Sequence, residues 1–242
     1  MDGQLTACVE VGASSVETVV LRDAQVVSAQ PGVHEPPTGA PLLIAVPGIV
    51  EGRTVVAASN LGWYDVDPAE ALGLTAAADL VCNDAEAAAL GESALRPGQP
   101  DLVFVGLGTG VGGAVVSGGR VDANLFAHLP GFGDALCRCT QTGCLETVAG
   151  GWALPHPLTA TDLARMAQAI AEAVDREPLA VPRLVVLAGG LSKSYPQLRE
   201  LVASSLPERD VQSTAATGTK SAAAWGLLHL WQLSHAPAIA QA

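Results

Sequence analysis

The chain has 242 residues, of which 49% are hydrophobic and 15% charged, a composition typical of a folded globular protein with one large or two small domains. Its 24 acidic and 12 basic residues give a formal net charge of −12, so we expect neither nucleic acid nor an anionic membrane as a partner. The longest apolar runs fall short of the roughly 20 residues that span a bilayer, and the N-terminus lacks the layout of a signal peptide. We therefore expect a cytoplasmic location.

The first third of the chain predicts a β-rich unit. β-branched and apolar runs predict strands over 5–12, 16–22 and 24–28, followed by a loop rich in proline and glycine over 29–41. Further strands are expected over 42–46, 50–57 and 80–82. A short helix over 68–72 is expected to be capped by Asp67, and another helix over 85–90.

The pattern of two strands joined by a turn recurs near residue 101, which indicates two related halves. Strands over 102–105 and 114–117 flank a glycine-rich turn over 106–113. Later come helices over 161–174, 195–205 and 220–233 and a buried strand over 184–187, with Thr159 or Thr161 as the cap of the first helix. This alternation predicts an α/β fold, and two halves imply a cleft of the kind in which ligands bind.

Three cysteines lie within eight residues, at Cys137, Cys139 and Cys144. In a reducing compartment such crowding favours metal binding over disulfides. Zinc in structural sites takes about four tetrahedral ligands, and His128 is the nearest histidine, so these four residues make a complete set for Zn²⁺, with Asp134 in reserve. The alternative is that the cysteines are simply buried in a loop.

The glycine-rich segment 106–113 joins two apolar strands. Glycines let backbone N–H groups approach a phosphate without obstruction by a Cβ, and Thr109 adds a hydroxyl donor. Because a strand and not a helix follows, this is not a dinucleotide fingerprint, and the lysine of a Walker loop is absent. A tight hairpin turn without a ligand is the alternative.

Two other strand ends carry candidate residues. Asp84 follows a short apolar strand and precedes a helix, so it is either a helix N-cap or a base that takes a proton from a sugar hydroxyl. Gly189 and Gly190 end the buried strand 184–187. They form either a plain turn into a helix or a backbone surface that lies against an adenosine.

Taken in order, these segments resemble the ROK (repressor, ORF, kinase) family of sugar kinases over most of the chain. The matching segments are 9–15 (usually D-x-G-G-T-K), 46–48 (V-P-G), 60–63 (N-L-x-W), 83–88 (N-D-A-N-A-A), 108–112 (G-T-G-I-G), 137–146 (C-x-C-G-x2-G-C-x-E) and the glycine pair 189–190. The zinc segment, the N-D pair and the G-T-G loop in this order make the resemblance specific.

The resemblance implies an α/β protein with the actin-like ATPase (RNase H-like) fold and two lobes around a central cleft. It implies a small lobe over 1–82, on which a C-terminal helix of about 221–242 packs back, and a large lobe over 83–220 with the nucleotide and zinc elements. It implies phosphoryl transfer from ATP with Mg²⁺ to a hydroxyl of a hexose, amino sugar or sugar-like metabolite, and a homodimer.

The resemblance also implies roles for single residues. Asp84 is then the catalytic base, and the zinc ion is structural, fixing the loop that holds His128 and Glu146. The implied sugar-binding residues are Gly48, Asn60, Asn83, Asp84, His128 and Glu146. The implied nucleotide-binding residues are Gly12, Ser14, Ser15, Gly108, Thr109, Gly110, Gly112, Gly189 and Gly190.

Five positions depart from the family pattern. Glu10 stands where the family has the aspartate that helps hold Mg²⁺, and its side chain is one methylene longer. Ala13 replaces a glycine, and Ser15 replaces a lysine, which removes a positive charge near the phosphates. Leu125 replaces a sugar-binding glutamate and makes the pocket more apolar, and Thr140 replaces the middle glycine of the zinc segment.

Two functions of different kinds follow. The first is the sugar kinase, which the intact Asp84 favours. The second is a non-catalytic sugar- or nucleotide-binding protein on the same scaffold, which Glu10, Ser15 and Leu125 favour. A transcriptional repressor is disfavoured, because we expect no DNA-binding module ahead of the first strand and the net charge has the wrong sign.

Overall fold

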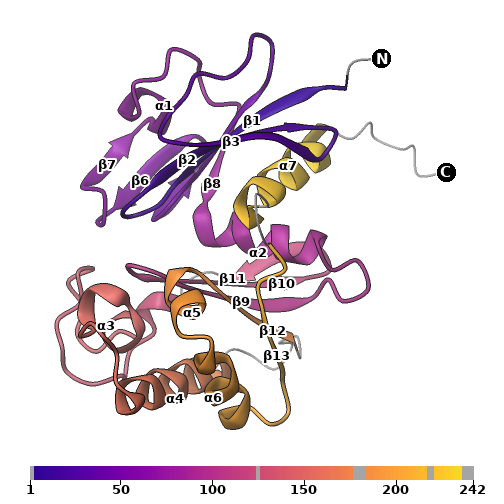
Figure 1. Ribbon diagram of the computed structural model, residues 1–242. Helices are drawn as coiled ribbons and strands as arrows, with labels where there is room; N and C mark the ends of the chain where they lie inside the picture. Colours follow the sequence, from indigo (N-terminus) through magenta and orange to yellow (C-terminus); the bar gives the residue numbers. More distant parts are fainter. Residues whose placement is uncertain (1–2, 124–125, 177–183, 217–220, 236–242) are drawn as a thin grey trace.

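A computed structural model describes residues 3–123, 126–176, 184–216 and 221–235, and two five-stranded sheets dominate it (Figure 1). The first sheet has the order β3-β2-β1-β4-β8. Its strands are β1 (Leu5–Val11), β2 (Val16–Arg22), β3 (Gln25–Pro31), β4 (Leu42–Val46) and β8 (Leu80–Asn83). The hairpin turn between β2 and β3 uses Asp23 and Ala24. Both have a positive φ, as the two central residues of a type I′ turn require.

The second sheet has the order β11-β10-β9-β12-β13. Its strands are β9 (Leu102–Leu107), β10 (Val111–Ser117), β11 (Arg120–Ala123), β12 (Leu184–Ala188) and β13 (Asp210–Ser213). In both sheets the first strand pairs antiparallel with its hairpin partner and parallel with a later strand, β4 in one case and β12 in the other. This equivalence confirms the two related halves predicted from the sequence.

The remaining elements are a small sheet and a set of helices. The small sheet contains β5 (Ile49–Glu51), β6 (Thr54–Ala58) and β7 (Trp63–Val66). The α-helices are α1 (Pro68–Ala71), α2 (Asp84–Ala94), α3 (Glu146–Ala149), α4 (Ala160–Arg176), α5 (Gly190–Ser194), α6 (Gln197–Ser205) and α7 (Ala222–His235). Two single-turn 3₁₀ helices, η1 (Phe126–His128) and η2 (Gly151–Ala153), flank α3.

Each large sheet is covered on both faces, because successive side chains of a strand point to opposite faces. In β1, Cys8 packs with α7 residues such as Leu227, whereas Val9 packs with the small sheet around Val55. In the second sheet, Phe104 packs against α2 and Val105 packs against the layer of α4 and α6. Figure 1 shows α2 and α7 lying between the two sheets, so these helices join the two halves.

Helices α2 and α7 cross in backbone contact. A Cβ at Gly91 would lie 1.7 Å from the Ala222 carbonyl oxygen, and a Cβ at Gly226 would lie 1.8 Å from that of Ala87. Only glycine allows this approach without a shift of the backbone. The contact holds α7, near the C-terminal end of the chain, on the first sheet, although the exact lobe boundaries remain a prediction.

Several predicted elements were wrong in detail. The single strand expected over 50–57 is the hairpin of β5 and β6, with Gly52 at a φ of +61° in its turn. The turn expected over 106–113 is shorter, because Gly106, Gly112 and Gly113 belong to β9 and β10. Of the two threonines expected to cap α4, Thr159 is confirmed, since its hydroxyl accepts a hydrogen bond from the Asp162 N–H at 3.2 Å.

Among the described residues, no helix is long and apolar enough to cross a membrane.

Candidate functional site

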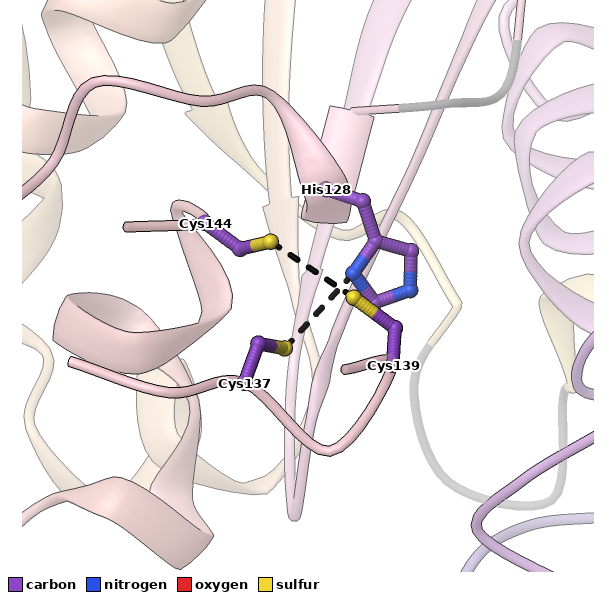
Figure 2. Close-up of side chains that lie close together, drawn as sticks. All are labelled: His128, Cys137, Cys139 and Cys144. Carbon is purple, nitrogen blue, oxygen red and sulfur yellow. Dashed lines mark hydrogen bonds between the residues drawn. The ribbon is translucent and has the colours of Figure 1, made fainter. Parts of the chain in front are cut away.

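The four residues of the expected metal set lie together: His128 ends η1, and the three cysteines lie in the loop between η1 and α3 (Figure 2). One ligand atom from each of His128, Cys137, Cys139 and Cys144 lies within 4.8 Å of the other three. His128 Nδ1 is 3.8 Å from Cys137 Sγ, and the Sγ atoms of Cys139 and Cys144 are 3.6 Å apart. A zinc ion with bonds of about 2.3 Å sets its ligands roughly 3.8 Å apart, so the residues fit a tetrahedral ion.

Backbone hydrogen bonds shape this loop. The Thr140 N–H donates to the Cys137 carbonyl at 2.9 Å and closes the turn that brings Cys139 beside Cys137. Thr140 has a φ of +75°, a conformation that glycine adopts readily and a β-branched residue rarely adopts. The structure therefore explains why glycine is usual at this position of the motif, and Thr140 stores backbone strain of about 1–3 kcal/mol.

The two glycine loops face each other. The Thr109 hydroxyl, in the turn between β9 and β10, donates to Ser14 Oγ at 3.3 Å, although 95 residues separate them. Gly12 and Ser15 close the other turn, because the Gly12 N–H donates to the Ser15 carbonyl at 2.7 Å. The loop from each sheet thus meets the loop from the other, and the side chains of Ser14 and Ser15 are exposed.

Glu146 lies beside the second glycine loop. It is 3% exposed, its Oε2 accepts the Val111 N–H at 2.9 Å, and its Oε1 accepts the Trp152 indole N–H at 3.0 Å. A Cβ at Gly110 would lie 2.4 Å from Glu146 Oε2 and 3.7 Å from Asn60 Nδ2. Asn60 Oδ1 is buried without a hydrogen-bond partner in the described ranges, an orphan acceptor that a ligand donor would satisfy.

Asp84, Asn83 and Gly48 form a second group, at the start of α2. Asn83 caps α2 through its Oδ1, which accepts the N–H groups of Ala85 and Glu86, and its Nδ2 donates to the Gly48 carbonyl at 2.8 Å. Asp84 is therefore the first residue of α2 and not its cap. A Cβ at Gly112 would lie 3.0 Å from Ala85 Cβ, so the start of α2 packs on the first residues of β10, directly after the glycine loop.

The electrostatic environment of Asp84 is unusual. Burial raises the pKa of the Asp84 carboxyl to about 6. The hydrogen bond that Asp84 accepts from the Ala85 N–H lowers this pKa but does not cancel the rise. A carboxyl with such a pKa is ionised at neutral pH and still basic enough to accept a proton. This is the property that a general base needs.

Gly189 and Gly190 follow β12 and open α5. Gly189 has a φ of +91°, and a Cβ there would lie 2.2 Å from the Leu107 carbonyl oxygen at the end of β9. At Gly190 a Cβ would meet no atom within 4 Å, so its outer face is open. The pair therefore lies next to the loop of Gly108, Thr109 and Gly110.

Glu10 is engaged with α7. Its Oε1 accepts hydrogen bonds from the Ser221 hydroxyl and from the Ala224 N–H, at 3.1 Å in the second case. Burial raises the pKa of the Glu10 carboxyl, and the Ser221 hydrogen bond opposes that rise. The expected magnesium ligand thus has one of its two oxygens committed to the N-terminus of a helix.

Sequence reasoning missed Trp152, Ser221 and Val111, which act on the expected residues Glu146 and Glu10. Val111 and Ser221 lie 35 and 211 positions from the residues that they bond, so no local pattern indicates these contacts. Trp152 is only six positions from Glu146, but the short turns between them carry no periodic signal. Leu125 lies outside the described residues.

A bilobal α/β protein with two related sheets and facing glycine loops, and with Asp84 at the start of a helix that packs on the second sheet, has the architecture of the actin-like ATPases. The model of the ROK family matches residues 33–177, and the chain belongs to this family.

The chain is 36% identical over 137 residues to a glucokinase of Halalkalibacterium halodurans, covering 51% of this chain and 39% of that protein. It is 38% identical over 123 residues to an N-acetylmannosamine kinase of Escherichia coli O157:H7, covering 45% of this chain and 41% of that one. The chain thus matches less than half of the length of these relatives.

A solved structure with the same fold is the ROK family glucokinase of Streptomyces griseus in complex with glucose and AMPPNP, with a TM-score of 0.71 and 21% identity. That comparison covers 93% of this chain and 98% of the glucokinase. It confirms the predicted actin-like fold.

Proposed function

We propose that the chain is a sugar kinase that transfers a phosphoryl group from ATP, with Mg²⁺, to a hydroxyl of a hexose, amino sugar or sugar-like metabolite. One observation supports this most: the glycine loops of the two halves meet, with Thr109 hydrogen-bonded to Ser14, beside the helix that begins with Asp84. Phosphoryl transfer depends on positioning and on charge stabilisation, and facing loops of N–H groups supply both.

In the proposed reaction Asp84 is the general base. Its carboxylate takes the proton of the attacking sugar hydroxyl while the new bond from oxygen to phosphorus forms and the bond from the γ-phosphorus to ADP breaks. Asn83 holds Gly48, and Glu146 and Asn60 offer acceptor oxygens to the other sugar hydroxyls. His128 is both a proposed sugar contact and a proposed metal ligand.

The nucleotide is proposed to lie along the two glycine loops. Gly12, Ser14 and Ser15 and, opposite them, Gly108, Thr109, Gly110 and Gly112 would contact the phosphates, and Gly189 and Gly190 would lie against the adenosine. We also propose that His128, Cys137, Cys139 and Cys144 hold a structural zinc ion. The homodimer implied by the resemblance and the cytoplasmic location expected from the sequence remain predictions.

The test is ADP formation with a panel of hexoses and amino sugars, beginning with glucose and N-acetylmannosamine, on which the relatives are named to act. We expect ADP formation that depends on a sugar, and a loss of about 10²–10⁴-fold in Asp84→Asn. Asp23→Asn, the same change in an exposed turn, is the matched control. A folded protein that forms no ADP with any sugar would contradict the proposal.

A non-catalytic sugar- or nucleotide-binding protein is the second candidate. The hydrogen bonds that Glu10 accepts from Ser221 and Ala224 favour this candidate, because they occupy one of the two carboxylate oxygens expected to help hold Mg²⁺. In that case a sugar or ATP would raise the melting temperature, since it binds only the folded state, without ADP being formed. Turnover that depends on Asp84 would exclude it.

A further inference from the structure

Trp152 makes hydrogen bonds both to Glu146, in the proposed sugar pocket, and to the glycine loop. Its indole N–H donates to Glu146 Oε1 at 3.0 Å, and its backbone N–H donates to the Thr109 carbonyl at 2.9 Å. The Gly151 N–H, one residue earlier, donates to the Gly108 carbonyl at 3.0 Å. The single turn η2 is thereby attached to the loop that follows β9, and this attachment sets the place of the indole.

The two oxygens of Glu146 each accept one protein N–H. Val111 supplies the donor for Oε2 from the start of β10, and Trp152 supplies the donor for Oε1. Two donors from different elements fix the rotation of the carboxylate, which one donor alone would leave free. A carboxylate has about four acceptor sites, so two remain for hydroxyl or amide N–H groups of a ligand.

The outer side of Trp152 is in contact with the metal loop. The guanidinium carbon of Arg138 lies 4.7 Å from the centre of the indole ring, within the range of a cation–π contact. Arg138 stands between Cys137 and Cys139, two of the four clustered ligands. The indole is therefore held between the metal loop on one side and Glu146 on the other.

We propose that Trp152 is a positioning residue that orients the Glu146 carboxylate for the sugar and connects this carboxylate with both the metal loop and the glycine loop. The proposal rests on the proposed sugar-kinase function. Asn60 lies near the same residue, since a Cβ at Gly110 would lie 3.7 Å from its Nδ2, and its orphan Oδ1 is a second acceptor in this region. The pair of acceptors selects a ligand that presents two donor groups, such as neighbouring hydroxyls or a hydroxyl and an amide N–H.

Trp152→Phe tests the proposal, because it keeps a ring for Arg138 and the backbone hydrogen bond to Thr109 but removes the indole N–H. A lost hydrogen bond to a charged group changes affinity by about 10-fold or more. We expect the KM for the sugar to rise by about that factor, with kcat and the KM for ATP changed less than threefold. Trp231→Phe, a partly buried tryptophan on α7, is the matched control and should leave all three constants unchanged.

A sugar KM within twofold of that of the unchanged protein, in a folded and metal-loaded Trp152→Phe variant, would overturn the proposal. A second measurement does not depend on turnover. The indole N–H resonance of Trp152, identified by its loss in Trp152→Phe, should move upfield in Glu146→Gln, where the acceptor loses its charge. An unmoved resonance would overturn the proposed orientation, whereas absence of turnover with every sugar would contradict the proposed function alone.

Discussion

Asp84 shows how one residue position decides between a structural and a chemical role. The capping of α2 is done by Asn83, whose side-chain oxygen accepts the N–H groups of Ala85 and Glu86. Asp84 is the first residue of α2 and not its cap, and burial raises the pKa of its carboxyl to about 6. Sequence reasoning left both roles open for Asp84, because the pair Asn83-Asp84 offers two adjacent capping side chains.

The raised pKa of Asp84 predicts the pH dependence of activity. A general base must be ionised, so kcat/KM for the sugar should be level above about pH 6 and fall about tenfold per pH unit below it. A pH–rate profile between pH 4.5 and 8.5 measures this. A profile that stays level down to pH 4.5 would contradict both the pKa and the role of base.

The raised pKa of Asp84 also makes the stability of the folded chain depend on pH. The pKa of Asp84 is higher in the folded chain than the ordinary 3.8, so its stabilising contribution is present below pH 3.8 and is lost as the pH rises through about 6. Asp84→Asn should therefore be more stable than the unchanged protein at pH 8, and the difference should shrink toward pH 4. Urea unfolding of both proteins at the two pH values checks the sign.

At the scale of elements, the loop between η1 and α3 positions both the cysteines of the potential metal site and Glu146. Its turns bring Cys137, Cys139 and Cys144 to His128, and the chain then enters α3 with Glu146 as the first residue. Cys144 and Glu146 are only two residues apart, so a metal that fixes the thiolate also fixes the start of α3. The spacing of the cysteines predicted the group correctly, whereas the short helices α3 and α5 have too few residues for a periodic signal.

The proposed zinc ion gives the prediction at this scale. The purified protein should contain about one zinc ion per chain, and Cys139→Ala should lose the metal and melt at a lower temperature, because metal binding contributes directly to the stability of the fold. Cys82→Ala, at a buried thiol outside the cluster, is the control and should keep its zinc. Elemental analysis and thermal unfolding measure both effects, and a Cys139→Ala variant with full zinc content would exclude the site.

For the whole molecule, a buried network lies on α2, the helix between the two sheets. Glu92, on α2, is fully buried and accepts hydrogen bonds from the Thr214 hydroxyl, from the Ala215 N–H at 2.9 Å and from Arg96. Arg96 also donates to the Ser213 carbonyl at 2.9 Å. This network ties α2 to the segment that leads from β13 of the second sheet toward α7 on the first.

Removal of Arg96 should destabilise the molecule strongly. In Arg96→Met the carboxylate of Glu92 stays buried without its cation, which costs about 3–5 kcal/mol of unfolding free energy. Arg165→Met removes an exposed ion pair with Asp162 on α4 and should cost less than about 1 kcal/mol. Urea denaturation compares the two variants, and a cost below about 1 kcal/mol for Arg96→Met would show that the network does not stabilise the fold.

The sequence by itself determined the α/β class, the two related halves, the group of four potential metal ligands and the resemblance to ROK kinases. These features depend on local patterns: alternation in strands, glycine turns and the spacing of cysteines. Only the tertiary structure decided that Trp152 bonds Glu146, that Glu10 bonds the start of α7 and that Glu92 bonds Thr214. The last two contacts join residues 211 and 122 positions apart, so side-chain packing and not local pattern selects these partners. Trp152 is only six positions from Glu146, and backbone hydrogen bonds attach its turn to the glycine loop.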